Sequence, residues 1–166
     1  KTLRAAGDEN LDRFEEAFEV YGRIFDDNCT YKVKPYDGIP EMLHQMKERG
    51  MKLGVLSNKP DRQAVHVVSE IFGTDTFDIV QGQKEGIPRK PDPAAALSIA
   101  GQFGISPKEA IYIGDSEVDA ATGKAAGMDT ILVSWGFRPK EELREAAPEW
   151  LVDRAEEIMA IIREKE

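Results

Sequence analysis

The sequence predicts an α/β protein in which a parallel sheet is covered by helices on both faces. From about residue 37 onward, short apolar runs alternate with amphipathic stretches that have helical spacing. This alternation is typical of parallel strands joined by crossover helices. The run at residues 52–57 also suits a strand that is buried on both faces. With 166 residues the chain can bury one core of this kind, and we expect a Rossmann-like, three-layer domain.

Residues 9–28 form the first expected element, a single amphipathic helix. Its apolar side chains recur at spacings of three and four residues: Leu11, Phe14, Phe18, Tyr21 and Phe25. Residues 30–36 are expected to be extended, because Pro35 disfavours a helix in the residues before it. We therefore predict a hinge there, which divides the chain into residues 1–34 and residues 35–166.

The second part contains the strands and helices of the expected sheet. The expected strands are residues 52–57, 77–80, 110–114 and 130–133, followed by a short apolar segment at 150–152. The expected helices are residues 38–49, 61–72, 92–103, 117–126, 139–146 and 154–163. Turn and cap residues support these limits. Gly50 follows the first helix, Pro93 opens the third, and Ser106 with Glu109 has the spacing of a capping box.

Composition and charge exclude several classes of protein. The net charge is −9 with acidic and basic residues interspersed, which argues against a nucleic-acid partner but allows an anionic substrate in a local positive pocket. No apolar run is long enough to cross a bilayer, and the first residues do not resemble a signal peptide. Cys29 is the single cysteine, so an internal disulfide is excluded and a reducing cytoplasm is the simplest setting.

Polar side chains follow three of the expected strands. Ser57 and Asn58 can donate hydrogen bonds to phosphate oxygens, although such residues also turn the chain and cap helices. Lys90 lies in the loop after the second strand and could neutralise phosphate charge, although it is also compatible with an ordinary exposed loop lysine. Asp115 and Asp119 follow the third strand, one helical turn apart. They could bind Mg²⁺, or they could cap the next helix and stabilise its N-terminus.

The carboxyl ends of parallel strands meet at one edge of a sheet, where ligands bind in folds of this kind. A neutral donor pair, a lysine and a carboxylate pair are therefore expected close together. This combination suits phosphoryl transfer assisted by Mg²⁺, and it lacks only the attacking group. We expect surface or structural roles for His44 and His66, which fall within helices, and packing roles for Trp135 and Trp150.

The order and spacing of these motifs resemble those of the haloacid-dehalogenase superfamily. Its second, third and fourth motifs are matched by Ser57-Asn58, by Lys90-Pro91 and by Gly114-Asp115-Ser116-Glu117-Val118-Asp119. Segments similar to its phosphoglycolate-phosphatase-like branch are Pro35-Tyr36-Asp37-Gly38-Ile39, Gly123-Lys124-Ala125-Ala126-Gly127-Met128 and Trp135-Gly136-Phe137. The likeness covers essentially the whole chain after Tyr36.

The resemblance implies a role for each matching residue. Ser57 would bind the transferring phosphoryl group, helped by the backbone N–H of Asn58. Lys90 would bridge the phosphate and the nucleophile, and Asp115 would be a direct ligand of the Mg²⁺ cofactor. Asp119 would hold a water of the metal or orient Lys90. The N-terminal helix would be the remnant of a helical cap, the module that covers the active site and reads the substrate.

One motif of the superfamily has no match. Its members begin with a strand that ends in Asp-x-Asp, which carries the phosphorylated nucleophile and the acid/base, and no Asp-x-Asp precedes the N-terminal helix here. In the superfamily this strand is central, between the strands expected at residues 52–57 and 110–114. We therefore expect two unpaired strand edges facing an apolar gap, unless a separate segment fills it.

The resulting expectation is a Mg²⁺-dependent phosphomonoesterase that acts on a small phosphorylated metabolite through an aspartyl-phosphate. The chain alone is expected to be inactive, with the missing N-terminal segment or a second copy of the chain as a partner. A phosphomutase of the β-phosphoglucomutase type stays open, because it shares these motifs and differs mainly in the cap. A non-catalytic fragment that keeps the phosphate pocket is a third alternative. A response-regulator receiver fits poorly, because it does not account for Ser57-Asn58 and Lys90-Pro91.

Overall fold

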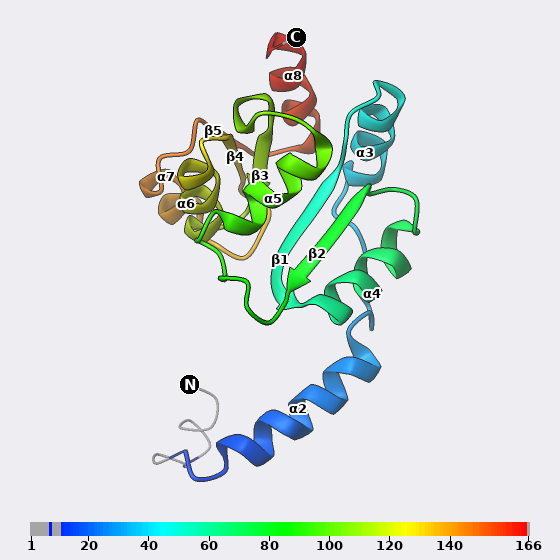
Figure 1. The fold of residues 1–166 in the computed structure, drawn as a ribbon, viewed down its shortest axis with the longest axis vertical. Helices are drawn as coiled ribbons and strands as arrows, with labels where there is room; N and C mark the ends of the chain where they lie inside the picture. Colours follow the sequence, from blue (N-terminus) through cyan, green and yellow to red (C-terminus); the bar gives the residue numbers. More distant parts are fainter. Residues whose placement is uncertain (1–6, 8–10, 166) are drawn as a thin grey trace. The chain divides into compact units, whose positions relative to one another are not determined.

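The chain divides into two compact units (Figure 1). The structure, a computed structural model, describes residue 7 and residues 11–165. The first unit is Lys1–Val33 and the second is Lys34–Glu166. The division falls within residues 30–36, one residue before the boundary expected between residues 34 and 35. That the first unit belongs to a cap stays a prediction.

The first unit contains the helix α2 (Phe14–Asn28). The rings of Phe14 and Phe18, one turn apart, stack with their centroids 5.8 Å from each other. The helix begins later than the spacing of apolar residues predicts. Leu11 has a φ of 61°, a left-handed conformation that cannot continue into an α-helix. Residues 9 and 10 of the predicted helix lie outside the described residues.

The strands of the second unit form two separate parallel sheets (Figure 1). The first sheet pairs β1 (Gly54–Pro60) with β2 (Ile79–Gln83). The second sheet has the order β3 (Ile111–Gly114), β4 (Asp129–Val133) and β5 (Trp150–Val152). Every pairing is parallel, as the alternation of strands and helices predicts. The short apolar segment at the end of the sequence supplies β5.

Helices alternate with these strands along the second unit. In chain order they are α3 (Ile39–Glu48), α4 (Asp61–Phe72), α5 (Ala94–Phe103), the one-turn helix η1 (Pro107–Glu109), α6 (Glu117–Ala126), α7 (Lys140–Glu145) and α8 (Ala155–Lys165). The capping box predicted at η1 is present, because the Ser106 hydroxyl accepts from the Lys108 N–H and the Glu109 carboxylate accepts from the Ser106 N–H. Within the described part of the chain, none of the helices combines the length and the apolar character needed to cross a membrane.

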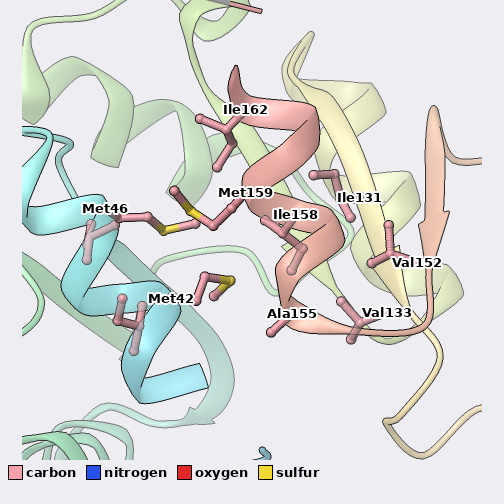
Figure 2. Packing of buried hydrophobic residues seen from close by; sticks show 11 residues of the cluster. Met42, Met46, Ile131, Val133, Val152, Ala155, Ile158, Met159 and Ile162 are labelled. Atoms are coloured by element: carbon pink, nitrogen blue, oxygen red, sulfur yellow. The ribbon is translucent and has the colours of Figure 1, made fainter. Parts of the chain in front are cut away.

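Buried side chains on both faces of β4 define the three layers of the second unit. Ile131 and Val133 belong to the large cluster beneath α3 and α8, which Figure 2 shows from close by. Leu132, between them, points to the opposite face and packs with Ala120 of α6 and Leu143 of α7. The strand layer is therefore covered by α3 and α8 on one face and by α6 and α7 on the other, as the fold class predicts.

Two strand edges have no ladder partner among the described residues. β1 pairs only with β2, and β3 pairs only with β4. A cleft of about 900 Å³ lies between these two edges, and its walls include residues 52–56 and 110–113. Apolar side chains from α5, among them Ile99 and Phe103, also line it. The structure therefore contains the pair of open edges and the apolar gap that the resemblance implies.

Replacing Leu132 by alanine tests the two-sided burial of β4. Leu132 is completely buried, and truncating such a side chain leaves a cavity, so we expect the free energy of unfolding to fall by about 2–5 kcal/mol. Leu97→Ala is the matched control, because Leu97 is 40% exposed on α5 and should change that free energy by about 0.5 kcal/mol at most. Urea denaturation followed by circular dichroism measures both variants. Equal losses would contradict the assignment of β4 as the central core strand.

Candidate active site

Ser57 and Asn58 lie in the second half of β1 rather than after it. The sequence predicted that this strand ends at Ser57, but β1 continues to Pro60. The backbone of Pro60 is extended, with a ψ of 138°, so β1 continues up to Asp61, where α4 begins at the predicted residue. Pairing with β2 is irregular between Leu56 and Pro60, so the polar residues fall where the ladder is interrupted. The Ser57 hydroxyl accepts a hydrogen bond from the Lys59 N–H at 3.1 Å.

Asn58 joins β1 to the loop that carries Lys90. Its side-chain oxygen accepts from the Lys90 N–H at 2.9 Å, and its amide group donates to the Lys90 carbonyl at 3.2 Å. The side chain therefore holds the backbone of Lys90 by two hydrogen bonds. The contact with phosphate that the resemblance implies for Asn58 would involve its backbone N–H.

The Lys90 ammonium group is held on three sides in a largely buried position. It donates to the Asp119 carboxylate at 2.7 Å and to the Leu56 carbonyl at 3.3 Å, and it lies 6.0 Å from the centre of the Tyr112 ring. The Lys90 side chain is only 13% exposed. Burial lowers the pKa of Lys90, but the neighbouring Tyr112 and Asp119 raise it more, so that the pKa lies above its usual value. Lys90 is therefore a desolvated cation at neutral pH.

Asp119 has hydrogen bonds to both of its carboxylate oxygens. Oδ1 accepts from Lys90, whereas Oδ2 accepts from the Ser116 hydroxyl at 2.6 Å and from the Asp115 N–H at 3.2 Å. The carboxylate approaches β3 so closely that a Cβ on Gly114 would lie 2.2 Å from the Cβ of Asp119. Of the two roles that the resemblance implies for Asp119, this geometry favours orienting Lys90.

Asp115 has one carboxylate oxygen that is open to a cation. Its Oδ2 accepts from the Phe137 N–H at 3.1 Å, and no described residue donates a hydrogen bond to its Oδ1. The described residues contain no group of three or more His, Cys, Asp or Glu side chains that could hold a metal. Mg²⁺ commonly takes one or two carboxylates and completes its shell with water and phosphate. Asp115 thus fits Mg²⁺ as one ligand of an incomplete set.

Several contacts of the site involve residues that the motifs did not single out. Tyr112 lies beside Lys90, and burial raises the pKa of its phenol. Leu56 contributes its carbonyl oxygen to Lys90, and Phe137 contributes its N–H to Asp115. Tyr112 stands on β3 three residues before Asp115, so its strand position was the available signal. The contacts of the Leu56 carbonyl and the Phe137 N–H are made by backbone groups, so the types of side chain in the sequence could not predict them.

The aromatic residues and histidines outside the site have the roles expected of them. Trp135 and Trp150 pack against the large core cluster. His44 on α3 is exposed and lies 3.4 Å from Glu48, one turn away. His66 on α4 is exposed as well. Neither histidine takes part in the hydrogen bonds that connect Lys90, Asp115 and Asp119.

Comparison with known proteins identifies the family. The family model described as haloacid dehalogenase-like hydrolase matches residues 2–133. This chain therefore belongs to the haloacid dehalogenase-like hydrolases, and the fold class and family expected from the motifs are confirmed.

The similar proteins include phosphatases with different substrates. The phosphoglycolate phosphatase of Nitrosococcus oceani is 28% identical over 156 residues, which cover 94% of this chain and 69% of that protein. The N-acetylmuramic acid 6-phosphate phosphatase of Pseudomonas aeruginosa is 29% identical over 155 residues, which cover 93% of this chain and 64% of that protein. A solved Lactobacillus delbrueckii subsp. bulgaricus protein, provisionally assigned as a phosphoglycolate phosphatase, has a TM-score of 0.80 and 36% identity. That match covers 84% of this chain but only 58% of the solved chain.

Replacing Asp119 by asparagine tests the ion pair with Lys90. The change leaves a largely buried ammonium group without its counter-charge, so we expect the free energy of unfolding to fall by about 3 kcal/mol. Because the pKa of Lys90 is raised, its stabilising charge is present below the usual lysine pKa and is lost only above the raised value. The loss should therefore be similar between about pH 6 and 9.

Asp153→Asn is the control for this measurement. Asp153 is 52% exposed and pairs with Lys140, and exposed pairs of this kind contribute little to stability. Urea denaturation at several pH values compares the two variants. An Asp119→Asn protein that is no less stable than Asp153→Asn would show that the buried pair is not the constraint described here.

Proposed function

We propose that this chain carries the phosphate site of a Mg²⁺-dependent phosphomonoesterase that acts through an aspartyl-phosphate, with the nucleophile supplied by a segment outside these 166 residues. The observation that carries the proposal is the buried Lys90 ammonium group, held 2.7 Å from Asp119. A desolvated and fixed cation stabilises charge that builds up on a transferring phosphoryl group. Similarity to two phosphatases of small phosphorylated compounds supports this class of substrate.

The residues at the carboxyl ends of the strands have separate roles in binding the phosphoryl group and Mg²⁺. The Ser57 hydroxyl and the Asn58 N–H donate to the phosphoryl oxygens, while the Asn58 side chain keeps Lys90 in place through its backbone. Lys90 neutralises charge shared between the phosphoryl group and the nucleophile. Asp119 keeps Lys90 charged and oriented. Asp115 holds Mg²⁺, which supplies further charge neutralisation and polarises the P–O bond when it is bound.

In the proposed reaction the nucleophile is a carboxylate that lies in line with the leaving oxygen. Its attack forms a P–O bond to the enzyme and breaks the P–O bond to the substrate alcohol, which leaves with a proton from an acid. Water then attacks the aspartyl-phosphate, which releases inorganic phosphate and restores the carboxylate. Both carboxylate oxygens of Asp119 accept hydrogen bonds, and Asp115 is the proposed metal ligand. The nucleophile would therefore come from another segment.

The cleft between β1 and β3 supports the placement of that segment. Its volume of about 900 Å³ and its two open strand edges suit one extended strand with hydrogen bonds on both sides. A strand that runs parallel to β1 and β3 would bring its carboxyl end to the same edge as Ser57 and Asp115. A carboxylate at that end would face Lys90.

Substituting Asp115 tests the assignment of the metal ligand. In the protein that includes the nucleophile segment, Asp115→Asn should raise the Mg²⁺ concentration needed for half-maximal activity at least about tenfold, because an amide cannot replace the carboxylate charge. Asp119→Asn should change that concentration less, since its carboxylate faces Lys90. Phosphate release measured against Mg²⁺ concentration compares the two. Unchanged Mg²⁺ dependence in Asp115→Asn would remove Asp115 from the metal site.

The 166-residue chain alone should not hydrolyse phosphomonoesters, and an added strand should restore turnover. We expect no activity above background with Mg²⁺ and a panel of phosphomonoesters, because the covalent step lacks its nucleophile. A peptide that carries an apolar strand ending in Asp-x-Asp should bind the chain and restore measurable phosphate release. The same peptide with the first Asp replaced by Asn is the control, and it should bind without restoring activity. Normal turnover by the purified chain, with its mass verified, would contradict the proposal.

A further inference from the structure

The loop after β4 lies so close to Asp115 that residue 136 has no room for a side chain. At Gly136, a Cβ would lie 2.3 Å from both the Cβ and the Oδ2 of Asp115. Atoms cannot approach to this distance without a shift of the backbone or of the carboxylate. Glycine is therefore required at this position for the loop to lie against Asp115.

The next residue of the loop binds the same carboxylate through its backbone. The Phe137 N–H donates to Asp115 Oδ2 at 3.1 Å, whereas the Phe137 ring is 93% exposed. Phe137 thus contributes its N–H to the site and leaves its side chain outside. One of the two oxygens of Asp115 therefore accepts a hydrogen bond and lies against the loop.

A third contact fastens the loop to the start of α6. Arg138 donates from Nε and from an Nη atom to the two oxygens of Glu117, at 2.8 and 2.6 Å. Such a two-point contact fixes the direction of both side chains, even where exposure limits its strength. Because Glu117 follows Asp115 by two residues, this ion pair holds the loop beside the carboxylate.

We propose that residues 136–138 clamp Asp115 so that it can offer a cation only Oδ1, and that this clamp favours Mg²⁺ over Ca²⁺. This inference rests on the proposed function, which makes Asp115 the metal ligand. Ca²⁺ takes six to eight oxygens and often binds a carboxylate through both oxygens, whereas Mg²⁺ requires a small octahedral shell. A carboxylate whose Oδ2 is hydrogen-bonded and covered by the loop backbone suits Mg²⁺. Gly136, Phe137 and Arg138 are then positioning residues that act through Asp115.

Competition between cations on the protein that includes the nucleophile segment tests the clamp without measuring activity. Mn²⁺ is the probe, because it broadens the amide resonances of nearby residues in a ¹⁵N-labelled protein. Titration of Mg²⁺ or Ca²⁺ against Mn²⁺ gives the ratio of their affinities. In Arg138→Gln and in Gly136→Ala, we expect the preference for Mg²⁺ over Ca²⁺ to fall at least about threefold, because Oδ2 becomes free for bidentate binding. If Arg138→Gln acted only by removing a positive charge, Mg²⁺ and Ca²⁺ would both bind more tightly. The ratio of their affinities would then stay unchanged.

Two variants serve as matched controls. Phe137→Ala keeps the N–H that binds Asp115, and Arg144→Gln removes a different exposed arginine, which pairs with Glu141 on α7. Both should keep the wild-type preference. An unchanged preference in Arg138→Gln and Gly136→Ala, both verified as folded by their spectra, would overturn the clamp. Mn²⁺ broadening that is absent in the wild type or unaffected by Asp115→Asn would instead overturn the metal assignment of the proposed function, and the clamp with it.

Discussion

The ion pair between Lys90 and Asp119 is the interaction on which the rest of the site depends. Lys90 belongs to the loop after β2 and is fixed by Asn58 of β1, whereas Asp119 belongs to α6 and is fixed by Ser116 and the Asp115 backbone. The pair therefore joins the part of the fold built on β1 and β2 to the part built on β3 to β5. Its charges are largely removed from water, and burying them is tolerable only because each oxygen of Asp119 has a partner.

The interrupted sheet is the second physical constraint, and it lies next to the first. The cluster that packs near the cleft consists largely of small side chains of α5 and α6, with Leu56 and Tyr112 from the two open strands against it. Ile113 on β3 is 38% exposed, although strands in the middle of a parallel sheet are ordinarily buried on both faces. An extended segment in the cleft would cover this apolar surface and satisfy the open backbone groups together. Under the proposed function, one added strand would complete both the core and the set of catalytic residues.

Much of the fold follows from the sequence, whereas the fine geometry of the site does not. Alternating apolar and amphipathic runs predicted the parallel strands and nearly all helices, and the order of the motifs predicted that Lys90, Asp115 and Asp119 meet at one edge. The starts and ends of elements were less accurate. The left-handed backbone at Leu11 shortens α2, and the extended backbone at Pro60 lengthens β1. Such features depend on backbone conformation, which side-chain periodicity does not report.

Sequence patterns also did not predict the backbone contacts that the candidate residues make. The Phe137 N–H on Asp115 and the Leu56 carbonyl on Lys90 join backbone groups to side chains 22 and 34 residues away. A double-mutant cycle on the free energy of unfolding tests the central claim most directly, with Lys90→Met, Asp119→Asn and the double variant compared by urea denaturation. The account predicts a coupling energy of about 2 kcal/mol or more, because each single change leaves one buried polar group unpaired. Effects that add within about 0.5 kcal/mol would contradict it, since independent residues behave in that way.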